Sequence, residues 1–234
     1  MNMQESEDSE EMIRTALFDL DGTILDTSKG IKESVEYTIK KMGLCKLSDN
    51  ELLSFIGPPL RQSFIANCGC SEEEAKEATR LFREYYQVGA VFHAKIYNGI
   101  VEAFKRLYER DIKMGVATNK PQRFAETLLK KYELNKYFMS ICGADESGSQ
   151  TKADLIQTCI NRIEASKVET VLIGDTTNDA VGAAQAGISF LAVTYGFGFK
   201  RSDELKDIHS IGIADSPLQI ADIILDEMDG SYIL

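Results

Sequence analysis

The sequence contains no apolar run long enough to cross a membrane. A transmembrane helix needs about 18 or more consecutive apolar residues, and no such stretch occurs. The first residues also lack the short apolar segment of a targeting peptide. We therefore expect neither membrane association nor a targeting peptide.

Cysteine is scarce and scattered. The five cysteines are an odd number spread along the chain, a pattern that does not suggest a disulfide framework. Cys68 and Cys70 flank one glycine, but no second pair completes a zinc site. We expect reduced thiols in a cytoplasmic protein.

Basic residues are too few for a nucleic-acid surface. The chain has 26 Lys and Arg against 37 Asp and Glu, a formal net charge of −11. Residues 1–11 hold five acids and no base, so the remainder carries about −6. Because phosphate backbones are bound by clustered Lys and Arg, we expect no nucleic-acid partner. Residues 1–11 are expected to form a disordered acidic N-terminus.

The composition is that of a globular protein, and residues 28–95 have the pattern of helices. Hydrophobic residues make up 44% of the 234 residues, enough for one large domain or one domain with an insert. Residues 28–95 show apolar residues at helical spacing, which predicts a small helical insert. Its expected helices are Ser28–Met42, Ser48–Ile56, Leu60–Cys68 and Ser71–Gly89.

Strands and helices alternate in the rest of the chain. The expected strands are Ile13–Leu20, Lys113–Thr118, Phe138–Cys142, Thr170–Ile173, Phe190–Thr194 and Ile211–Ala214. The expected helices are Gly99–Arg110, Pro121–Tyr132, Lys152–Ile163, Asn178–Ala186 and Ser216–Glu227. This alternation predicts an α/β fold with a Rossmann-like parallel sheet, formed by residues 12–27 and 96–234. Ligands of such sheets bind beyond the carboxyl ends of the strands.

The first strand ends in two carboxylates. Asp19 and Asp21 are two residues apart, so on an extended chain both side chains face the same side. Their repulsion raises a pKa unless a cation neutralises them. The pair predicts either a divalent metal site or a nucleophile with a proton-transfer acid. A turn with two solvated acids is the alternative.

A second acidic pair follows the strand that ends at Ile173. Asp175 and Asp179 lie at the entry to a helix, where helix capping alone would explain them. Together with Asp19 and Asp21, however, they place four carboxylates at one sheet edge. Such a cluster requires a hard cation, and its all-oxygen ligands indicate Mg²⁺.

Lys152 and Thr118 complete the candidate site. A capping-box pattern at Thr151–Asp154 places Lys152 in the first turn of a helix. It is either a surface lysine or the partner of a carboxylate and an anionic substrate. Thr118 is either a plain strand end or a phosphate ligand, acting with the following backbone N–H groups, including that of Asn119. A metal cation, a hydroxyl, an ammonium and a carboxylate nucleophile together are typical of a phosphoryl-transfer site.

These motifs resemble those of the haloacid dehalogenase superfamily of phosphohydrolases. Asp19-Leu-Asp21-Gly-Thr23, Thr118, Lys152 and Gly174-Asp175-x-x-x-Asp179 occur in the family's order. The insert at residues 28–95 resembles the family's C1 cap. Two more stretches are similar to the phosphoglycolate phosphatase group and its 5′-nucleotidase-like relatives, Phe55-Ile-Gly-Pro-Pro-Leu-Arg61 and Val193-Thr-Tyr-Gly-Phe-Gly198.

The resemblance implies a role for each acid. Asp19 would be the nucleophile that becomes an aspartyl-phosphate, and Asp21 would protonate the leaving alcohol and then deprotonate the attacking water. Mg²⁺ would be held by Asp19, the backbone carbonyl of Asp21, and Asp175. Asp179 would support that metal site.

The resemblance also implies a set of substrate contacts. Lys152 and Thr118 would neutralise charge on the transferring group, with Asn119 beside them. Independently of the resemblance, the position of Arg61 after Pro58-Pro59 would let it reach a carboxylate or second phosphate of the substrate; a surface arginine is the alternative. The expected partner is a small phosphorylated metabolite. Phosphoglycolate, a nucleoside monophosphate and pyrophosphate all fit, and nothing in the sequence indicates an oligomeric state.

Three other activities fit the sequence less well than this hydrolase. A β-phosphoglucomutase-like isomerase would use the same acids, but no residue of the insert is assignable to that task, and the lone His93 is more simply structural. A non-catalytic phosphoryl sensor also combines Asp, Thr and Lys, yet it needs neither Asp21 nor a cap. Dehalogenation is disfavoured because a leaving halide requires no acid at position 21. We predict a Mg²⁺-dependent phosphomonoester hydrolase.

Overall fold

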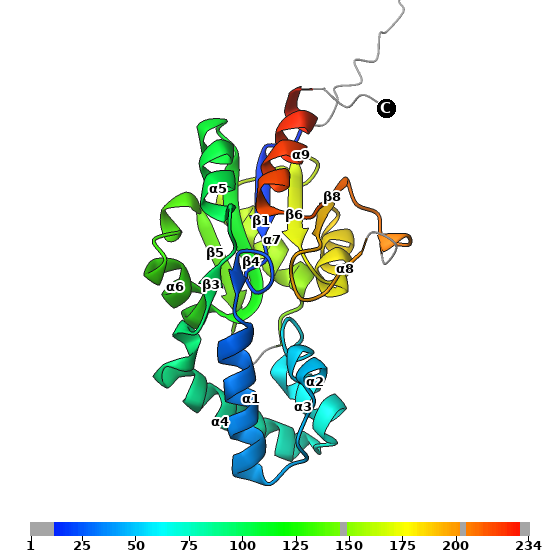
Figure 1. The fold of residues 1–234 in the computed structure, drawn as a ribbon. Coiled ribbons are helices and arrows are strands. Elements are labelled where there is room, and N and C mark those ends of the chain that lie inside the picture. Colours follow the sequence, from blue (N-terminus) through cyan, green and yellow to red (C-terminus); the bar gives the residue numbers. More distant parts are fainter. Residues whose placement is uncertain (1–11, 146–148, 202–204, 230–234) are drawn as a thin grey trace, which may run out of the picture.

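The computed structural model describes residues 12–145, 149–201 and 205–229. The acidic stretch 1–11, expected to be disordered, lies outside these ranges. Figure 1 shows a sheet with helices on both faces and a group of helices beyond one end of it.

The sheet has six parallel strands in the order β5-β4-β1-β6-β7-β8. They are β1 Thr15–Phe18, β4 Lys113–Pro121, β5 Ser140–Ala144, β6 Thr170–Gly174, β7 Ser189–Val193 and β8 Gly212–Ala214. The predicted parallel α/β fold is confirmed. The chain leaves β1 toward β4 and β5 on one side, and later adds β6, β7 and β8 on the other. The strand order therefore switches at β1, the position where ligands of such sheets bind.

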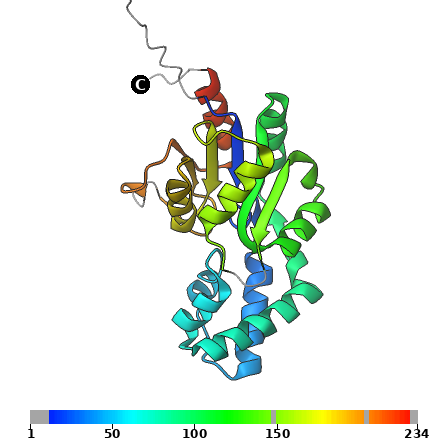
Figure 2. The same ribbon diagram turned by 180° about the vertical axis from the view of Figure 1, so that it is seen from behind.

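Alternate residues of the central strand serve two separate cores. Phe18 points into one, with side chains of α5 (Ile100–Glu109), α6 (Gln122–Lys131) and α9 (Pro217–Asp229). Leu17 points into the other, with α7 (Lys152–Ile163) and α8 (Thr177–Ala186). Figures 1 and 2 view the sheet from these two sides. Because both faces are covered, all four residues of β1 are buried.

Four helices gather beyond the sheet, on the side to which the loop after β1 leads (Figures 1 and 2). They are α1 Ser28–Met42, α2 Asp49–Leu53, α3 Leu60–Cys68 and α4 Glu72–Val88. The Ser71 side chain accepts from the backbone N–H of Glu74 in a capping box at the start of α4. We call α1 to α4 the helical unit.

A short strand pair joins the helical unit to the core and was not predicted. β2 (Leu25–Asp26) pairs antiparallel with β3 (Lys95–Ile96), after the short 3₁₀ helix Ala90–Phe92. Two residues per strand are too few to produce a visible alternation in the sequence. A second 3₁₀ helix, Asn135–Tyr137, precedes β5.

The expected strand Ile13–Leu20 and helix Ser48–Ile56 are shorter in the structure, at Thr15–Phe18 and Asp49–Leu53, and β4 is longer than predicted. This strand continues past Thr118 to Pro121, with a register shift between these residues against β5. Pro121 was expected to begin a helix; instead it precedes α6 in an extended conformation. The extension carries Asn119 and Lys120 out beyond the sheet, toward the helical unit.

Within the described ranges, no helix is long and apolar enough to span a membrane.

Phe104 on α5 offers a test of the larger core. Its ring is fully buried and lies 5.1 Å from Phe18 and 5.2 Å from Phe138, centroid to centroid. We expect Phe104→Ala to lower the free energy of unfolding by about 3–5 kcal/mol, because the cavity cannot close fully. Tyr108→Ala, one turn further and 61% exposed, should cost about 0.5 kcal/mol. Urea denaturation measures both; equal losses would contradict this packing.

Candidate active site

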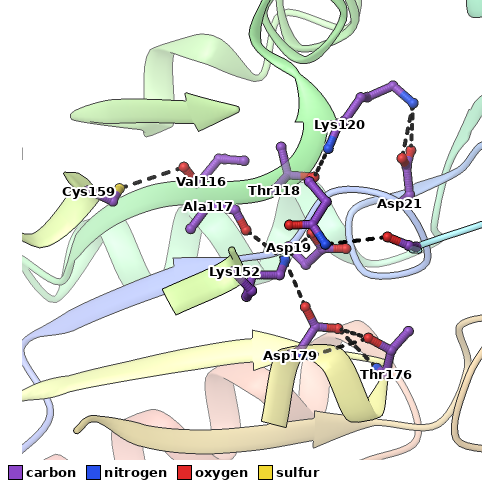
Figure 3. A network of polar contacts seen from close by, with 12 residues as sticks. Asp19, Asp21, Val116, Ala117, Thr118, Lys120, Lys152, Cys159, Thr176 and Asp179 are labelled. Carbon is purple, nitrogen blue, oxygen red and sulfur yellow. Dashed lines mark hydrogen bonds and ion pairs between the residues drawn. The ribbon is translucent and has the colours of Figure 1, made fainter. Parts of the chain in front are cut away.

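The predicted site residues come together at the switch in strand order. Asp19 follows β1, Thr118 lies on β4, and Asp175 follows β6. These three strands are neighbours in the sheet, so their carboxyl ends meet at one edge. Figure 3 shows Asp19, Thr118, Lys152 and Asp179 around one point.

Lys152 is the centre of the polar network. Its Nζ donates to Oδ1 of Asp19 at 2.6 Å, to Oδ1 of Asp179 at 2.7 Å, and to the carbonyl of Ala117 at 2.9 Å (Figure 3). Burial alone would lower the pKa of this ammonium, but Asp179 and Asp19 reverse the effect and raise it. Lys152 therefore stays charged although it is only 4% exposed.

Local sequence explains how Lys152 reaches this position. The Thr151 hydroxyl accepts from the backbone N–H of Asp154, so the predicted capping box is present and Lys152 is the first residue of α7. The lysine stem then passes Gly182 of α8, where an added Cβ would lie 2.4 Å from Cγ of Lys152. The small residues of α8 are thus what lets the two helices pack this closely.

Asp19 is buried beside Lys152. Burial raises its pKa from the ordinary 3.8 to about 6, while the ammonium of Lys152 acts in the opposite direction and Asp179 adds repulsion. The carboxylate is therefore poorly solvated and close to cationic and anionic groups at once. Such an environment is typical of catalytic carboxylates.

Asp175 is fully buried and only half satisfied. Its Oδ2 accepts from the backbone N–H groups of Phe197 at 2.7 Å and Gly198 at 3.1 Å. Among the described residues, its Oδ1 has no hydrogen-bond partner. Burial, followed by repulsion from Asp179 and Asp19, raises the pKa of Asp175 to about 7. A buried carboxylate oxygen without a partner is costly, so this atom is suited to an added ligand.

Two glycines bring the backbone close enough to hold Asp175. Gly22 has a φ of +90°, and an added Cβ there would lie 2.3 Å from Oδ2 of Asp175. At Gly196 an added Cβ would lie 2.4 Å from the carbonyl oxygen of Gly22. The glycines in the stretch Val193–Gly198 therefore allow this loop to approach Asp175 and the Gly22 turn closely.

Asp179 uses both of its oxygens within the protein. Oδ1 contacts Lys152, and Oδ2 accepts from the backbone N–H and the hydroxyl of Thr176. Thr176 and Asp179 form the capping box of α8. Asp179 therefore takes part in the helix cap through one oxygen and pairs with Lys152 through the other.

The carboxylates suit a hard divalent cation. Oxygens of Asp19, Asp175 and Asp179 all lie within 4.8 Å of one another. Asp175 also has a buried Oδ1 that, among the described residues, has no hydrogen-bond partner. Oxygen donors of this kind are those that Mg²⁺ prefers. The residues present thus fit the predicted ion.

Asp21 lies apart from these three carboxylates. Lys120 Nζ contacts both of its oxygens, at 3.1 and 3.0 Å, and the Thr27 hydroxyl donates to Oδ1 at 2.8 Å. Lys120 was missed in the sequence. A signal was present, because on an extended chain a residue two positions after Thr118 points to the same side.

Thr118, Asn119 and Arg61 have different surroundings. Thr118 is buried, and its hydroxyl accepts from the backbone N–H of Lys120 at 3.2 Å. Asn119 donates through Nδ2 to the carbonyl of Gly57 in the helical unit at 3.4 Å. Arg61 forms a half-exposed ion pair with Glu72 at 2.6 Å.

Two adjoining cavities open onto the site. The smaller pocket is lined by Asp19, Asp21, Gly57, Thr118, Asn119, Lys120, Lys152, Thr176, Asn178 and Asp179. The larger cavity has a volume of about 1260 Å³ and lies against α3, α4 and the start of α6, with Arg61 on its wall. Four residues line both cavities, namely Asp21, Gly57, Asn119 and Lys120.

Comparison with known proteins shows the family of this chain. The family model for haloacid dehalogenase-like hydrolases matches residues 16–193. A 5′-nucleotidase of Pseudomonas aeruginosa is 34% identical, covering 81% of this chain and 86% of the relative. Phosphoglycolate phosphatase 1 of the same organism is 30% identical, covering 92% and 83%.

A solved structure is similar over nearly the whole chain. A predicted phosphatase from Clostridium acetobutylicum is 32% identical and covers 92% of this chain and 99% of its own, with a TM-score of 0.86. The relatives by sequence and by structure carry the names of phosphatases and nucleotidases. The predicted family resemblance and the predicted phosphatase activity are confirmed.

The raised pKa of Asp175 predicts a pH-dependent response to Mg²⁺. A carboxyl group whose folded pKa is raised stabilises the fold below its unfolded pKa and loses that contribution as the pH rises through the folded value. With 3.8 as the ordinary pKa and about 7 in the fold, the metal-free protein should lose stability between about pH 4 and pH 7. Added Mg²⁺ should therefore raise Tm more at about pH 7.5 than at about pH 5.

Asp175→Asn is the control for this measurement. The amide does not titrate, so thermal scans should show a flatter pH dependence of Tm and a smaller gain from Mg²⁺. An equal gain in wild type at both pH values would contradict the assignment of Asp175.

Proposed function

We propose that this chain, which belongs to the haloacid dehalogenase-like hydrolase family and is a phosphatase, hydrolyses phosphomonoesters of small metabolites through an aspartyl-phosphate. The proposal is carried by the position of the Lys152 ammonium, which lies between the carboxylates of Asp19 and Asp179 in the smaller pocket. A phosphoryl group entering that pocket meets a buried cation directly beside a carboxylate nucleophile.

Asp19 and Asp21 divide the chemistry between them. An Asp19 oxygen attacks phosphorus, the bond from phosphorus to the leaving oxygen breaks, and Asp21 gives that oxygen a proton. Water then attacks the phosphorus of the aspartyl-phosphate, Asp21 takes a proton from the water, and inorganic phosphate and the Asp19 carboxylate are released. One carboxyl group can act as acid and then as base because its proton returns in the second step. Lys152 and Thr118 hold the transferring group.

Mg²⁺ is the cofactor we assign to this site. Asp19, Asp175 and the backbone carbonyl of Asp21 would hold the ion. Asp179 supports it through Lys152, because both Asp179 oxygens already accept hydrogen bonds. When bound, Mg²⁺ supplies positive charge to the transferring phosphoryl group.

The helical unit is proposed to act as a cap. Gly57 lines both cavities, and its carbonyl accepts from Asn119 of the core. Residues 28–95 would thus close over the phosphoryl group and exclude water during its transfer. The leaving group would lie in the larger cavity. Arg61 would bind a second anionic group there only by exchanging Glu72 for the substrate.

A 5′-nucleotidase activity is the second candidate within this mechanism. The larger cavity, at about 1260 Å³, has Phe55, Phe82 and Phe124 among its lining residues, which suits a base and a ribose. Phosphoglycolate would fill a small part of that volume. The relative named a 5′-nucleotidase is 34% identical to this chain.

The proposed compartment is the cytoplasm. All five cysteines are free thiols, which supports a reducing environment.

Phosphate release from a substrate panel tests the proposal. We expect Mg²⁺-dependent turnover of phosphoglycolate or nucleoside monophosphates, with pyrophosphate and glucose phosphates as further members. Asp19→Asn should lower kcat by about 10⁴-fold or more, because the amide cannot act as the nucleophile. Asp222→Asn, an exposed acid paired with Arg106, is the matched control and should keep full activity. Turnover that survives in Asp19→Asn would reject Asp19 as the nucleophile.

A further inference from the structure

Lys120 is a second buried lysine at the site, and the proposed chemistry does not yet use it. It is 7% exposed, and its Nζ lies 3.1 Å from Oδ1 and 3.0 Å from Oδ2 of Asp21. Asp21 is itself 9% exposed. The Thr27 hydroxyl also donates to Oδ1. Lys120 and Thr27 together therefore hold both oxygens of the Asp21 carboxylate.

The helical unit covers this lysine. The Tyr86 ring of α4 lies 5.0 Å from Lys120 Nζ, measured to the ring centroid. Tyr86 is 2% exposed and is fixed by Phe82, stacked at 5.4 Å, and by Phe124 of the core, edge-on at 5.1 Å. A cation over an aromatic face is stabilised most when water is excluded from it. Tyr86 of α4 therefore packs against the same ammonium that contacts Asp21.

We propose that Lys120, held under Tyr86, is a positioning residue that orients Asp21 for the hydrolysis of the aspartyl-phosphate. The inference rests on the proposed function. In that step a water oxygen bonds to phosphorus, the bond between phosphorus and the Asp19 oxygen breaks, and the water proton passes to Asp21. The carboxylate must point at the water when this happens. Fixing both of its oxygens removes the rotational freedom that would otherwise misplace it.

A positioning role in the second step has a kinetic signature. With 4-nitrophenyl phosphate the leaving group is stable as an anion, so transfer to Asp19 needs no proton from Asp21. Loss of Lys120 should then slow only the later hydrolysis. In the Mg²⁺-loaded protein, Lys120→Met should lower kcat by about 10²-fold, with KM falling in parallel and kcat/KM within about 3-fold of wild type.

Stopped-flow measurement of the nitrophenolate burst adds a second test, because loss of a merely structural residue would not produce a burst. Lys120→Met should release a burst of nitrophenolate approaching one per active site, and acid-quenched protein should carry phosphate. Lys120→Arg keeps a cation and should restore much of kcat with a smaller burst. Tyr86→Leu should show a burst smaller than that of Lys120→Met, and Tyr86→Phe, which keeps the ring, a smaller one again.

Lys131→Met is the matched control. Lys131 also lies over an aromatic ring, 4.5 Å from the centroid of Phe92, but it is exposed and does not line the cavities. Its removal should leave kcat and the absence of a burst unchanged.

Two outcomes would overturn the inference. Wild-type kcat in Lys120→Met would show that Asp21 is oriented without it. An equal fall in kcat and kcat/KM without a burst, in a variant with wild-type thermal stability, would place Lys120 before phosphoryl transfer. If wild type releases no phosphate, or Asp19→Asn retains activity, the proposed function itself is wrong and this inference falls with it.

Discussion

The candidate active site depends on the balance between buried carboxylates and buried ammonium groups. Four carboxylates, those of Asp19, Asp21, Asp175 and Asp179, lie at or below 9% exposure at one edge of the sheet. Two equally buried lysines, Lys152 and Lys120, lie among them. With every group ionised, the cluster carries two excess negative charges. Buried negative charge is unfavourable, and burial, together with repulsion from neighbouring carboxylates, raises the pKa values of Asp19 and Asp175. One divalent cation has the charge that this cluster lacks, which supports the proposed Mg²⁺ site.

The fold explains why the charges converge. The central strand β1 is flanked by β4 and β6, so the three carboxyl ends deliver Asp19, Thr118 and Asp175 to one edge without long loops. Close approach then depends on missing side chains. Gly182 admits the Lys152 stem, while Gly22 and Gly196 let two loops close on Asp175. The strands place Asp19, Thr118 and Asp175 at one edge, and glycines allow the close approach of Lys152 and of the loops around Asp175.

The sequence predicted what is local and missed what is distant. Asp19 and Asp21 were found from their spacing of two, and Lys152 from the capping box around it, because these signals lie within a few residues. The pairing of Lys120 with Asp21 spans 99 positions, so the spacing of two from Thr118 places Lys120 near the site but does not identify its partner. The strand pair β2–β3 was missed because two residues per strand give no period. The two functions of Asp179 could not be separated either, since the same spacing serves a helix cap and a lysine partner.

The helical unit contributes to the site from two directions. The Gly57 carbonyl accepts a hydrogen bond from Asn119, and the Tyr86 ring packs over the Lys120 ammonium. Both core residues lie on the part of β4 that extends past Thr118, the feature that the sequence did not predict. This extension therefore connects the residues that line the smaller pocket to the helices around the larger cavity. If the helical unit moves, the surroundings of Asp21 must change with it, whereas Lys152 and its two carboxylates belong wholly to the core. Such a division would let the helices vary with the substrate while the phosphoryl site stays constant.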